Sequence, residues 1–446
     1  MKQSHTRRSF LKAGSALGLG SASGLILPSR LLGADSPSKK VNIALIGSGG
    51  RGSQLLRELI NIPQARVIVT CDPFKDRREA QAGVVNGASG NNHCKPVEDF
   101  REVMADSNVD AVVVATPDHW HVPVAIAAAK AKKDMYVEKP LGLSMPRAAQ
   151  LRDLIRANKL VFQYGTQQHS SLSGRQAVEL VWNEYVGKIK RVDVVSPTQD
   201  KDARCPLIEE PVPEGLNYDL WLGPARETPY FARRVSAEGV WFCYDYALGF
   251  IAGWGAHPLD VLQWGLQTED TAPVSYKGTG FYPKEPDLFD TVRTWDVEMQ
   301  YANGMEVRFL DQHSAIPVLK DKHPRLRDNE VIWHGTEGFV THTRGGAMLY
   351  RNGKYENVGK IDFSQFAKRA EVSPQHMQNF VDCVISRKDP VSTIEAALHS
   401  DSISHLSNLA VRSGKEIAYD PKTVSITNDK ALDAMLTRKI RKGYEV

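Results

Sequence analysis

The sequence has few of the features that stabilise small secreted or metal-bound folds. Its 446 residues include five cysteines, an odd number without any CxxC spacing, so we predict neither a disulfide framework nor a zinc site. The net charge of +4 is close to balanced and lies partly in the N-terminal segment, which argues against nucleic-acid binding. No internal repeat occurs, and no later apolar stretch is long enough to cross a bilayer. The remaining chain, about 410 residues, is sufficient for two domains with substantial cores.

The N-terminal segment has the pattern of an export signal. The sequence TRRSFLK contains the paired Arg7 and Arg8, and a weakly apolar stretch follows over residues 14–27. This order is typical of a twin-arginine signal, which directs folded proteins with bound cofactors out of the cytoplasm; an ordinary N-terminal tail is the alternative. Residues 32–34 fit a cleavage site only at the last position, so an uncleaved tether also stays open. We expect a periplasmic or extracytoplasmic protein that uses the twin-arginine export machinery, with residues 1–34 as its signal segment.

A glycine-rich pattern follows an apolar stretch that is typical of a buried strand, residues 41–46. The sequence GSGGRG at residues 47–52 begins a predicted helix, and a second apolar strand at residues 66–70 leads to Asp72. In dinucleotide-binding folds the glycines permit a tight turn, close approach of the pyrophosphate and close helix packing, while the acid accepts hydrogen bonds from the ribose. The predicted cofactor contacts here are Gly47, Ser48, Gly49, Gly50, Arg51, Gly52 and Asp72.

The acidic residue after the second strand favours NAD over NADP. The Asp72 carboxylate would repel the 2′-phosphate of NADP, although Arg51, Lys75 or Arg77 can offset that repulsion. Free nicotinamide cofactor is scarce outside the cytoplasm. We therefore expect an exported enzyme to hold its cofactor tightly and to recycle it in place.

Strands and helices alternate after the glycine pattern, which predicts a doubly wound parallel sheet. The expected elements are strands at residues 111–115 and 135–137 and helices at about 122–132 and 144–158.

Two polar motifs fall at the carboxyl ends of these strands, where such sheets bind their ligands. They are TPDHWH at residues 116–121 and EKP at residues 138–140. His119 and His121 form an HxH pair, but no third ligand has a recognisable spacing, so we predict cofactor contact or helix capping rather than a metal site. The further cofactor contacts predicted from these motifs are Thr116, Pro117, His121, Glu138 and Lys139.

The order of these motifs resembles the Gfo/Idh/MocA family, which includes glucose–fructose oxidoreductases and inositol dehydrogenases. The resemblance also rests on WLGP at residues 221–224 and GAHPLD at residues 255–260, and it spans nearly the whole chain after the signal. It implies an α/β protein with an NAD(P)-binding Rossmann domain at residues 35–165 and a C-terminal α+β domain at residues 166–446. The second domain would contain a large, mostly antiparallel open sheet that binds a sugar or cyclitol and joins homo-oligomers. A closing helix at about residues 396–414 would pack back near the first domain.

The resemblance also assigns catalytic roles. Lys139 corresponds to an active-site lysine that holds the substrate oxygen, with a surface lysine as the alternative interpretation, and His257 corresponds to the general base. Many relatives have an aspartate four residues before that histidine, where this sequence has Gly253. Asp260, one helical turn after His257, is the candidate that would orient the imidazole, and Asp245 is a second; both are also compatible with surface or capping roles.

Aromatic and amide side chains suited to sugars occur in the same part of the chain. Aromatic rings can cover the apolar faces of a pyranose, although we expect at least half of them to be core residues, Trp264 first among them. The rings are Trp221, Tyr230, Trp241, Tyr244, Tyr246, Trp254 and Trp264. We predict substrate contacts from Gln167, Trp221 and Tyr246. Residues 415–446 are predicted to form an arm, either an oligomer contact or a loose tail.

These features favour an exported NAD(P)-dependent oxidoreductase that acts on a CH–OH group of a sugar, cyclitol or glycoside. A resemblance to glycoside hydrolase family 109 leaves a second mechanism open, in which transient oxidation permits elimination, and water addition and re-reduction return the cofactor unchanged. A non-catalytic nucleotide-binding protein is a third alternative, which loss of Lys139 or His257 would have favoured; both residues are present. A cytoplasmic dehydrogenase remains open only if Arg7 and Arg8 do not form a signal.

Overall fold

The computed structural model describes residues 40–199, 204–284, 287–373 and 375–445. The predicted signal segment, residues 1–34, lies outside the described residues. Within the described part of the chain, no helix combines the length and the apolar character needed to cross a bilayer.

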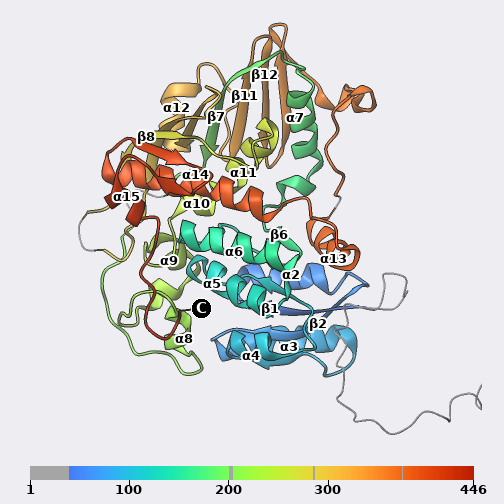
Figure 1. Ribbon diagram of the computed structural model, residues 1–446, viewed down its shortest axis with the longest axis vertical. Helices are drawn as coiled ribbons and strands as arrows, with labels where there is room; N and C mark the ends of the chain where they lie inside the picture. The colour runs from blue at the N-terminus through green and yellow to red at the C-terminus, as the bar shows by residue number, and fades with distance from the viewer. Residues whose placement is uncertain (1–39, 200–203, 285–286, 374, 446) are drawn as a thin grey trace, which may run out of the picture. The chain divides into compact units, whose positions relative to one another are not determined.

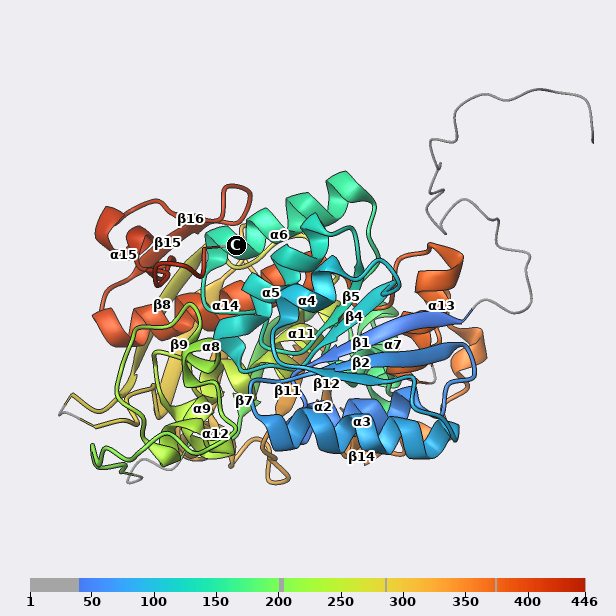
Figure 2. The ribbon, with the colours of Figure 1, turned by 90° about the horizontal axis from the view of Figure 1, so that it is seen from below.

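The first sheet has six parallel strands in the order β3-β2-β1-β4-β5-β6. Figure 1 shows β1 and β2 in blue, and Figure 2 shows β2, β1, β4 and β5 side by side. The chain reverses its direction of strand addition between β1 and β4, so the cleft of a doubly wound sheet opens there. This confirms the predicted Rossmann-type sheet. The strands are β1 (Val41–Ile46), β2 (Ala65–Cys71), β3 (Lys95–Val97), β4 (Ala111–Val114), β5 (Asp134–Val137) and β6 (Phe162–Tyr164).

Helices cover both faces of this sheet. Figure 2 shows α2 and α3 on one face and α5 and α6 on the other. The predicted helix at 122–132 begins four residues earlier, at Asp118, because Pro117 ends the preceding loop and an acid in the first turn suits the helix dipole. The helices are α2 (Gly50–Leu59), α3 (Lys75–Ser89), α4 (Phe100–Ala105), α5 (Asp118–Lys130) and α6 (Met145–Asn158).

A helix from the far end of the chain, α13 (His376–Ser386), completes one face of the first sheet. Its Phe380 packs in the same buried cluster as Ile43 and Leu45 of β1, whereas the alternate residues Ala44 and Ile46 face the cluster on the other side. Strand side chains alternate between the two faces, so each face needs its own apolar cover. The sequence analysis did not predict this helix.

The second sheet has ten strands in the order β14-β13-β12-β11-β7-β10-β9-β8-β15-β16. Its β7 and β10 pair in parallel, and the other neighbours are antiparallel. This confirms the predicted large, mostly antiparallel sheet. The strands are β7 (Ile189–Ser196), β8 (Ser275–Phe281), β9 (Thr294–Gln300), β10 (Glu306–Asp311), β11 (Glu330–Gly335), β12 (Gly338–Thr343), β13 (Gly346–Arg351), β14 (Lys354–Glu356), β15 (Ile417–Asp420) and β16 (Ser425–Ile426).

The remaining helices pack on the second sheet or connect it to the first. The α-helices are α7 (Leu172–Trp182), α8 (Tyr218–Leu222), α9 (Ala237–Phe242), α10 (Phe250–Gly253), α11 (Ala256–Leu266), α12 (Gln312–Leu319), α14 (Ile394–Ser413) and α15 (Lys430–Ala434). The 3₁₀-helices are η2 (Gln167–Ser170), η3 (Ala232–Val235), η4 (Val358–Lys360) and η5 (Phe363–Gln365).

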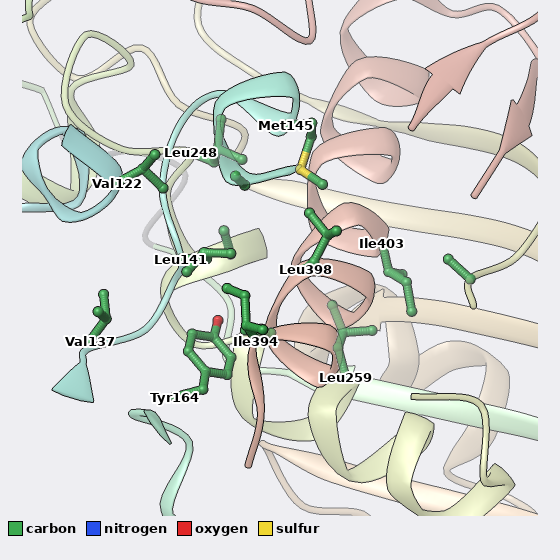
Figure 3. Close-up of a cluster of buried hydrophobic side chains, with 14 of the residues drawn as sticks. Val122, Val137, Leu141, Met145, Tyr164, Leu248, Leu259, Ile394, Leu398 and Ile403 are labelled. Atoms are coloured by element: carbon green, nitrogen blue, oxygen red, sulfur yellow. The ribbon is translucent and has the colours of Figure 1, made fainter. Parts of the chain in front are cut away.

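The closing helix α14 packs against both sheets. It contacts α11 and β8 of the second part and α6 and β6 of the first. Figure 3 shows Ile394 and Leu398 of α14 beside Leu141, Met145 and Tyr164, all of which belong to one buried cluster. The closing helix therefore shares buried contacts with elements of both sheets.

The C-terminal arm is bound along the molecule. β15 pairs with β8 and extends the second sheet, the Leu436 carbonyl accepts a 3.0 Å hydrogen bond from the Met145 amide, and the Arg441 Nε donates to the Gly223 carbonyl at 2.8 Å. The loose-tail interpretation is therefore wrong for residues 415–445.

All five cysteines are buried and free of disulfides, although they lie in both parts of the molecule. Burial raises the pKa of every one of these thiols, because it disfavours the charged thiolate. The cysteines are Cys71, Cys94, Cys205, Cys243 and Cys383.

Candidate functional site

A cavity of about 560 Å³, which we call the nucleotide pocket, lies beyond the carboxyl ends of β1, β2 and β4. Gly47 has φ +93°, and a Cβ atom on Gly52 would lie 1.9 Å from the Gly47 carbonyl oxygen. Both positions therefore require glycine. A Cβ on Gly49, by contrast, would meet only the Arg77 side chain at 3.7 Å, so this backbone is open to a ligand.

The predicted ribose-binding acid lines the nucleotide pocket. The two Asp72 carboxylate oxygens accept hydrogen bonds from the Ser48 amide at 2.7 Å and the Phe74 amide at 2.9 Å, which fix its orientation. Burial raises the pKa of Asp72, opposed by these backbone donors. Arg77 also lines the pocket, with its guanidinium carbon 3.7 Å from the centre of the Phe74 ring. A dinucleotide fits this set: glycine backbone for the pyrophosphate and a fixed carboxylate for the ribose.

A second cavity, of about 460 Å³, shares part of its wall with the nucleotide pocket, and we call it the second pocket. The walls common to both include Gly50, Arg51, Thr116, Asp118 and Trp241. The structure brings five predicted site residues together at the second pocket in addition to the shared ones: His121, Glu138, Lys139, Gln167 and His257.

Lys139 follows β5 and enters the second pocket. Its Nζ donates a 2.7 Å hydrogen bond to the Gly253 carbonyl and lies 5.3 Å from the centre of the Trp241 ring. Burial lowers the pKa of Lys139, while the carboxylates of Glu138 and Asp118 act in the opposite direction. The lysine is thus held inside the pocket as a hydrogen-bond donor.

His257 lies in the first turn of α11 and lines the second pocket. It is 4% exposed, and its Nδ1 has no hydrogen-bond partner. Burial lowers the pKa of His257 well below its usual value, and the nearby charges of Lys139 and Arg344 lower it further. The imidazole is therefore neutral at neutral pH and able to accept a proton.

The two aspartates considered as partners of His257 lie elsewhere. Asp260 is fully buried, its Oδ2 is 2.9 Å from Nε2 of His169, and it lines neither pocket. Asp245 lies 3.3 Å from Arg226 and from Arg234. Among the described residues, no carboxylate lies within ion-pair distance of His257, so this geometry does not support an orienting role for Asp260.

Another acid occupies the junction of the two pockets. Asp118, in the first turn of α5, lines both cavities and is 4% exposed, and its buried Oδ2 has no hydrogen-bond partner. Burial raises the pKa of Asp118 to about 8, opposed by Lys139. The sequence analysis quoted this residue within its motif without assigning it a role. Its position after Pro117, at the start of a helix beyond a strand end, was the available signal.

The other motif residues hold the walls of the second pocket. Glu138 accepts from Arg51 Nε at 2.7 Å and from the Tyr136 hydroxyl at 3.2 Å. The His121 ring nitrogens lie 2.6 Å from the Pro140 carbonyl and 2.8 Å from the Thr116 carbonyl. His121 therefore joins the loop after β4 to the loop after β5.

The three residues predicted to contact the substrate do not lie in one pocket. Gln167, in η2, lines the second pocket, whereas Trp221 lines the nucleotide pocket. Tyr246 lines neither: it is fully buried, with its ring 4.9 Å from Trp221. Within the described ranges, no group of three or more His, Cys, Asp or Glu residues could hold a metal ion.

The sequence analysis also missed one cation of the second pocket. Arg344 lies in the turn between β12 and β13, and its guanidinium carbon is 5.7 Å from the centre of the Trp254 ring. No local motif marks this turn. The pairing of distant strands brings it to the pocket.

Comparison with known proteins identifies related chains for both parts. Residues 41–166 match a family described as "Oxidoreductase family, NAD-binding Rossmann fold", and residues 199–317 match its C-terminal alpha/beta domain. A glycosyl hydrolase family 109 protein of Solibacter usitatus is 31% identical over 30% of this chain and 33% of its own length. The scyllo-inositol 2-dehydrogenase (NAD(+)) of Bacillus subtilis is 30% identical over 28% of this chain and 35% of its own. The matched region thus spans about a third of either relative.

A solved structure shares the fold over most of the chain. Levoglucosan dehydrogenase, in complex with NADH and levoglucosan, superposes with a TM-score of 0.60 and 15% identity, covering 85% of this chain and 99% of that one. At this identity the likeness concerns the fold alone. The two family matches together span more than half of the 446 residues, and the protein therefore belongs to the Gfo/Idh/MocA oxidoreductase family.

Proposed function

We propose that the protein is an exported oxidoreductase that oxidises a CH–OH group of a sugar, cyclitol or glycoside with a tightly bound NAD(P) cofactor. The observation that carries the activity is the second pocket, where Lys139 and His257 lie together beside the nucleotide pocket. The names of two relatives, an inositol dehydrogenase and levoglucosan dehydrogenase, support a carbohydrate or cyclitol substrate.

Each reactive side chain has a role that its environment supports. The Lys139 ammonium, anchored on the Gly253 carbonyl, donates to the substrate oxygen and stabilises the negative charge that develops there. The neutral imidazole of His257 takes the hydroxyl proton. When bound, the nicotinamide supplies the acceptor for the hydride that leaves the same carbon.

The remaining parts of the proposal have separate supports. The fixed Asp72 carboxylate favours NAD over NADP. The twin-arginine pattern with Arg7 and Arg8 supports export, and an exported enzyme has reason to recycle its cofactor in place. The family resemblance supports a homo-oligomer joined through the ten-stranded sheet.

The match to a glycosyl hydrolase family 109 protein favours a second candidate. In this form, oxidation makes a neighbouring C–H acidic, a glycosidic substituent is eliminated, and water addition and re-reduction restore the cofactor. Lys139 and His257 suit the first step of both reactions, so the two candidates differ in their products and not in these residues.

The first experiment purifies the full chain without added cofactor, denatures it and separates the released nucleotides by chromatography. Near-stoichiometric NAD(H) supports a bound, recycled cofactor, whereas an empty protein that binds cofactor only weakly contradicts it. Incubation with sugars and aryl glycosides then distinguishes the candidates. An oxidised sugar with reduced nicotinamide indicates the dehydrogenase, and a hydrolysed glycoside without net reduction indicates the second candidate.

The export part of the proposal has its own test. Replacing Arg7 and Arg8 with lysine should retain the protein in the cytoplasm.

A further inference from the structure

The second pocket contains more positive charge than hydride transfer requires. Three cationic side chains line it: Arg51, Lys139 and Arg344. Arg51 forms an ion pair with Glu138, and Lys139 is held by the Gly253 carbonyl. These two cations therefore have fixed partners within the protein.

Arg344 has no such carboxylate partner. Arg344 is exposed at the mouth of the pocket and forms no ion pair within the described residues, and its guanidinium carbon lies 5.7 Å from the centre of the Trp254 ring. Its charge nevertheless acts on the reactive groups, because it contributes to lowering the pKa values of both Lys139 and His257. An unpaired cation near a second, half-buried cation is repelled, and an anion bound between them would relieve that repulsion.

The nearby acids do not balance this charge. The Glu138 carboxylate is paired with Arg51, and burial raises the pKa of Asp118 to about 8, which favours its neutral form. Arg344 also lines the second pocket without lining the nucleotide pocket. Its position thus matches a substrate group better than a cofactor phosphate.

The space beside Lys139 is open. A Cβ atom on Gly253, whose carbonyl holds the lysine, would meet nothing within 4 Å, and the cavity measures about 460 Å³. This is sufficient for a sugar with an additional substituent.

We propose that the substrate is an acidic carbohydrate whose oxyanion group, a carboxylate, sulfate or phosphate, is bound by the Arg344 guanidinium while its reacting hydroxyl lies at Lys139 and His257. The planar guanidinium fork matches the oxygens of such groups and stacks on aromatic rings, as it does at Trp254. This inference rests on the proposed function for the reacting hydroxyl only.

The test measures binding by calorimetry on the full chain with its cofactor. The probes are glucuronate, glucose 6-phosphate, glucose 6-sulfate and glucose. We expect one of the three acids to bind more tightly than glucose, and its identity distinguishes carboxylate, phosphate and sulfate. R344Q should weaken the binding of that acid by roughly 10- to 100-fold, since a hydrogen bond to a charged group is lost, and should weaken the binding of glucose clearly less. R344K should show an intermediate loss. The matched control is R66Q, because Arg66 is an exposed arginine of β2 that lines neither pocket.

The failure of this inference is separable from that of the proposed function. Acids that bind no better than glucose, or an R344Q protein that binds them normally, would overturn the inference even if glucose still reduces the bound nicotinamide. Loss of cofactor from R344Q without an effect on acid binding would also overturn it, by assigning Arg344 to the cofactor. Arg344-dependent binding of an acid without any nicotinamide reduction or glycoside hydrolysis would support the inference while contradicting the proposed function.

Discussion

The two pockets are built from different parts of the chain and from different groups. The nucleotide pocket depends on backbone: glycines that admit the ligand and amides that fix Asp72. The second pocket depends on side chains from residues that are far apart in the sequence, such as Arg51 and Arg344. A pocket made of backbone tolerates few changes in shape, whereas a pocket made of side chains can change its ligand through single substitutions.

The largest effect should come from the second pocket. We expect His257→Ala to lower turnover by about 10²- to 10⁴-fold, because the proton acceptor is removed while the nucleotide pocket is untouched. Steady-state kinetics with nucleotide analysis of the purified variant measures both effects. His313→Ala is the control, since His313 is exposed in the first turn of α12. Normal turnover in His257→Ala would exclude the residue as the base.

A substitution in the nucleotide pocket should instead reduce cofactor binding and the stability of the fold. The Cβ of Gly52→Ala would overlap the Gly47 carbonyl at 1.9 Å, so the turn must shift, which costs about 1–3 kcal/mol of unfolding free energy and releases the cofactor. Nucleotide content and thermal unfolding report the result. Gly83→Ala in α3 is the control, because its Cβ meets nothing within 4 Å. Full cofactor retention by Gly52→Ala would contradict the assignment of this turn.

The smallest effect concerns the residue that belongs to both pockets. The pKa of Asp118 is about 8 in the folded protein against an ordinary 3.8, so between these values the folded state binds the extra proton. Stability contributed by this proton is present at low pH and is lost as the pH rises through about 8. An asparagine at this position cannot ionise, so Asp118→Asn should reduce the loss of unfolding free energy between low pH and pH 8. We expect a difference of the order of 1 kcal/mol, because water that enters the pocket lowers the cost of the buried charge.

Urea unfolding at a series of pH values measures this slope for Asp118→Asn and the parent protein. Asp321→Asn serves as the control, since Asp321 is an exposed aspartate that lines neither pocket. Identical slopes for all three proteins would show that Asp118 is ionised in the folded state at neutral pH.

The contrast between the pockets also explains what the sequence could predict. The buried-strand patterns and the glycine spacing act locally, so β1 and the turn at residues 47–52 were predicted at their observed positions. The helix α13 was missed because it covers a sheet whose strands lie more than 200 residues earlier in the chain. Arg344 was missed for the same reason: its hairpin is local, but it joins the sheet through β11, which pairs with β7 more than 100 residues earlier in the chain.

Helical spacing misled the search for a partner of His257. It placed Asp260 one turn away on the same helix, but the spacing does not reveal that η2 brings His169 to 2.9 Å from that carboxylate. Asp260 therefore lies beside His169 of η2, although the helical spacing predicted that it would lie beside His257. Local periodicity indicates which residues share a helix face, and tertiary packing decides which partner each of them meets.

The burial of the five cysteines has a consequence for the surroundings in which this fold can persist. Disulfide exchange and sulfur oxidation start from an accessible thiolate, and burial raises the pKa of each thiol while keeping it from solvent. The folded chain therefore needs neither a reducing environment to protect its thiols nor an oxidising one to link them. A molecule of this kind keeps the same covalent structure on both sides of a membrane.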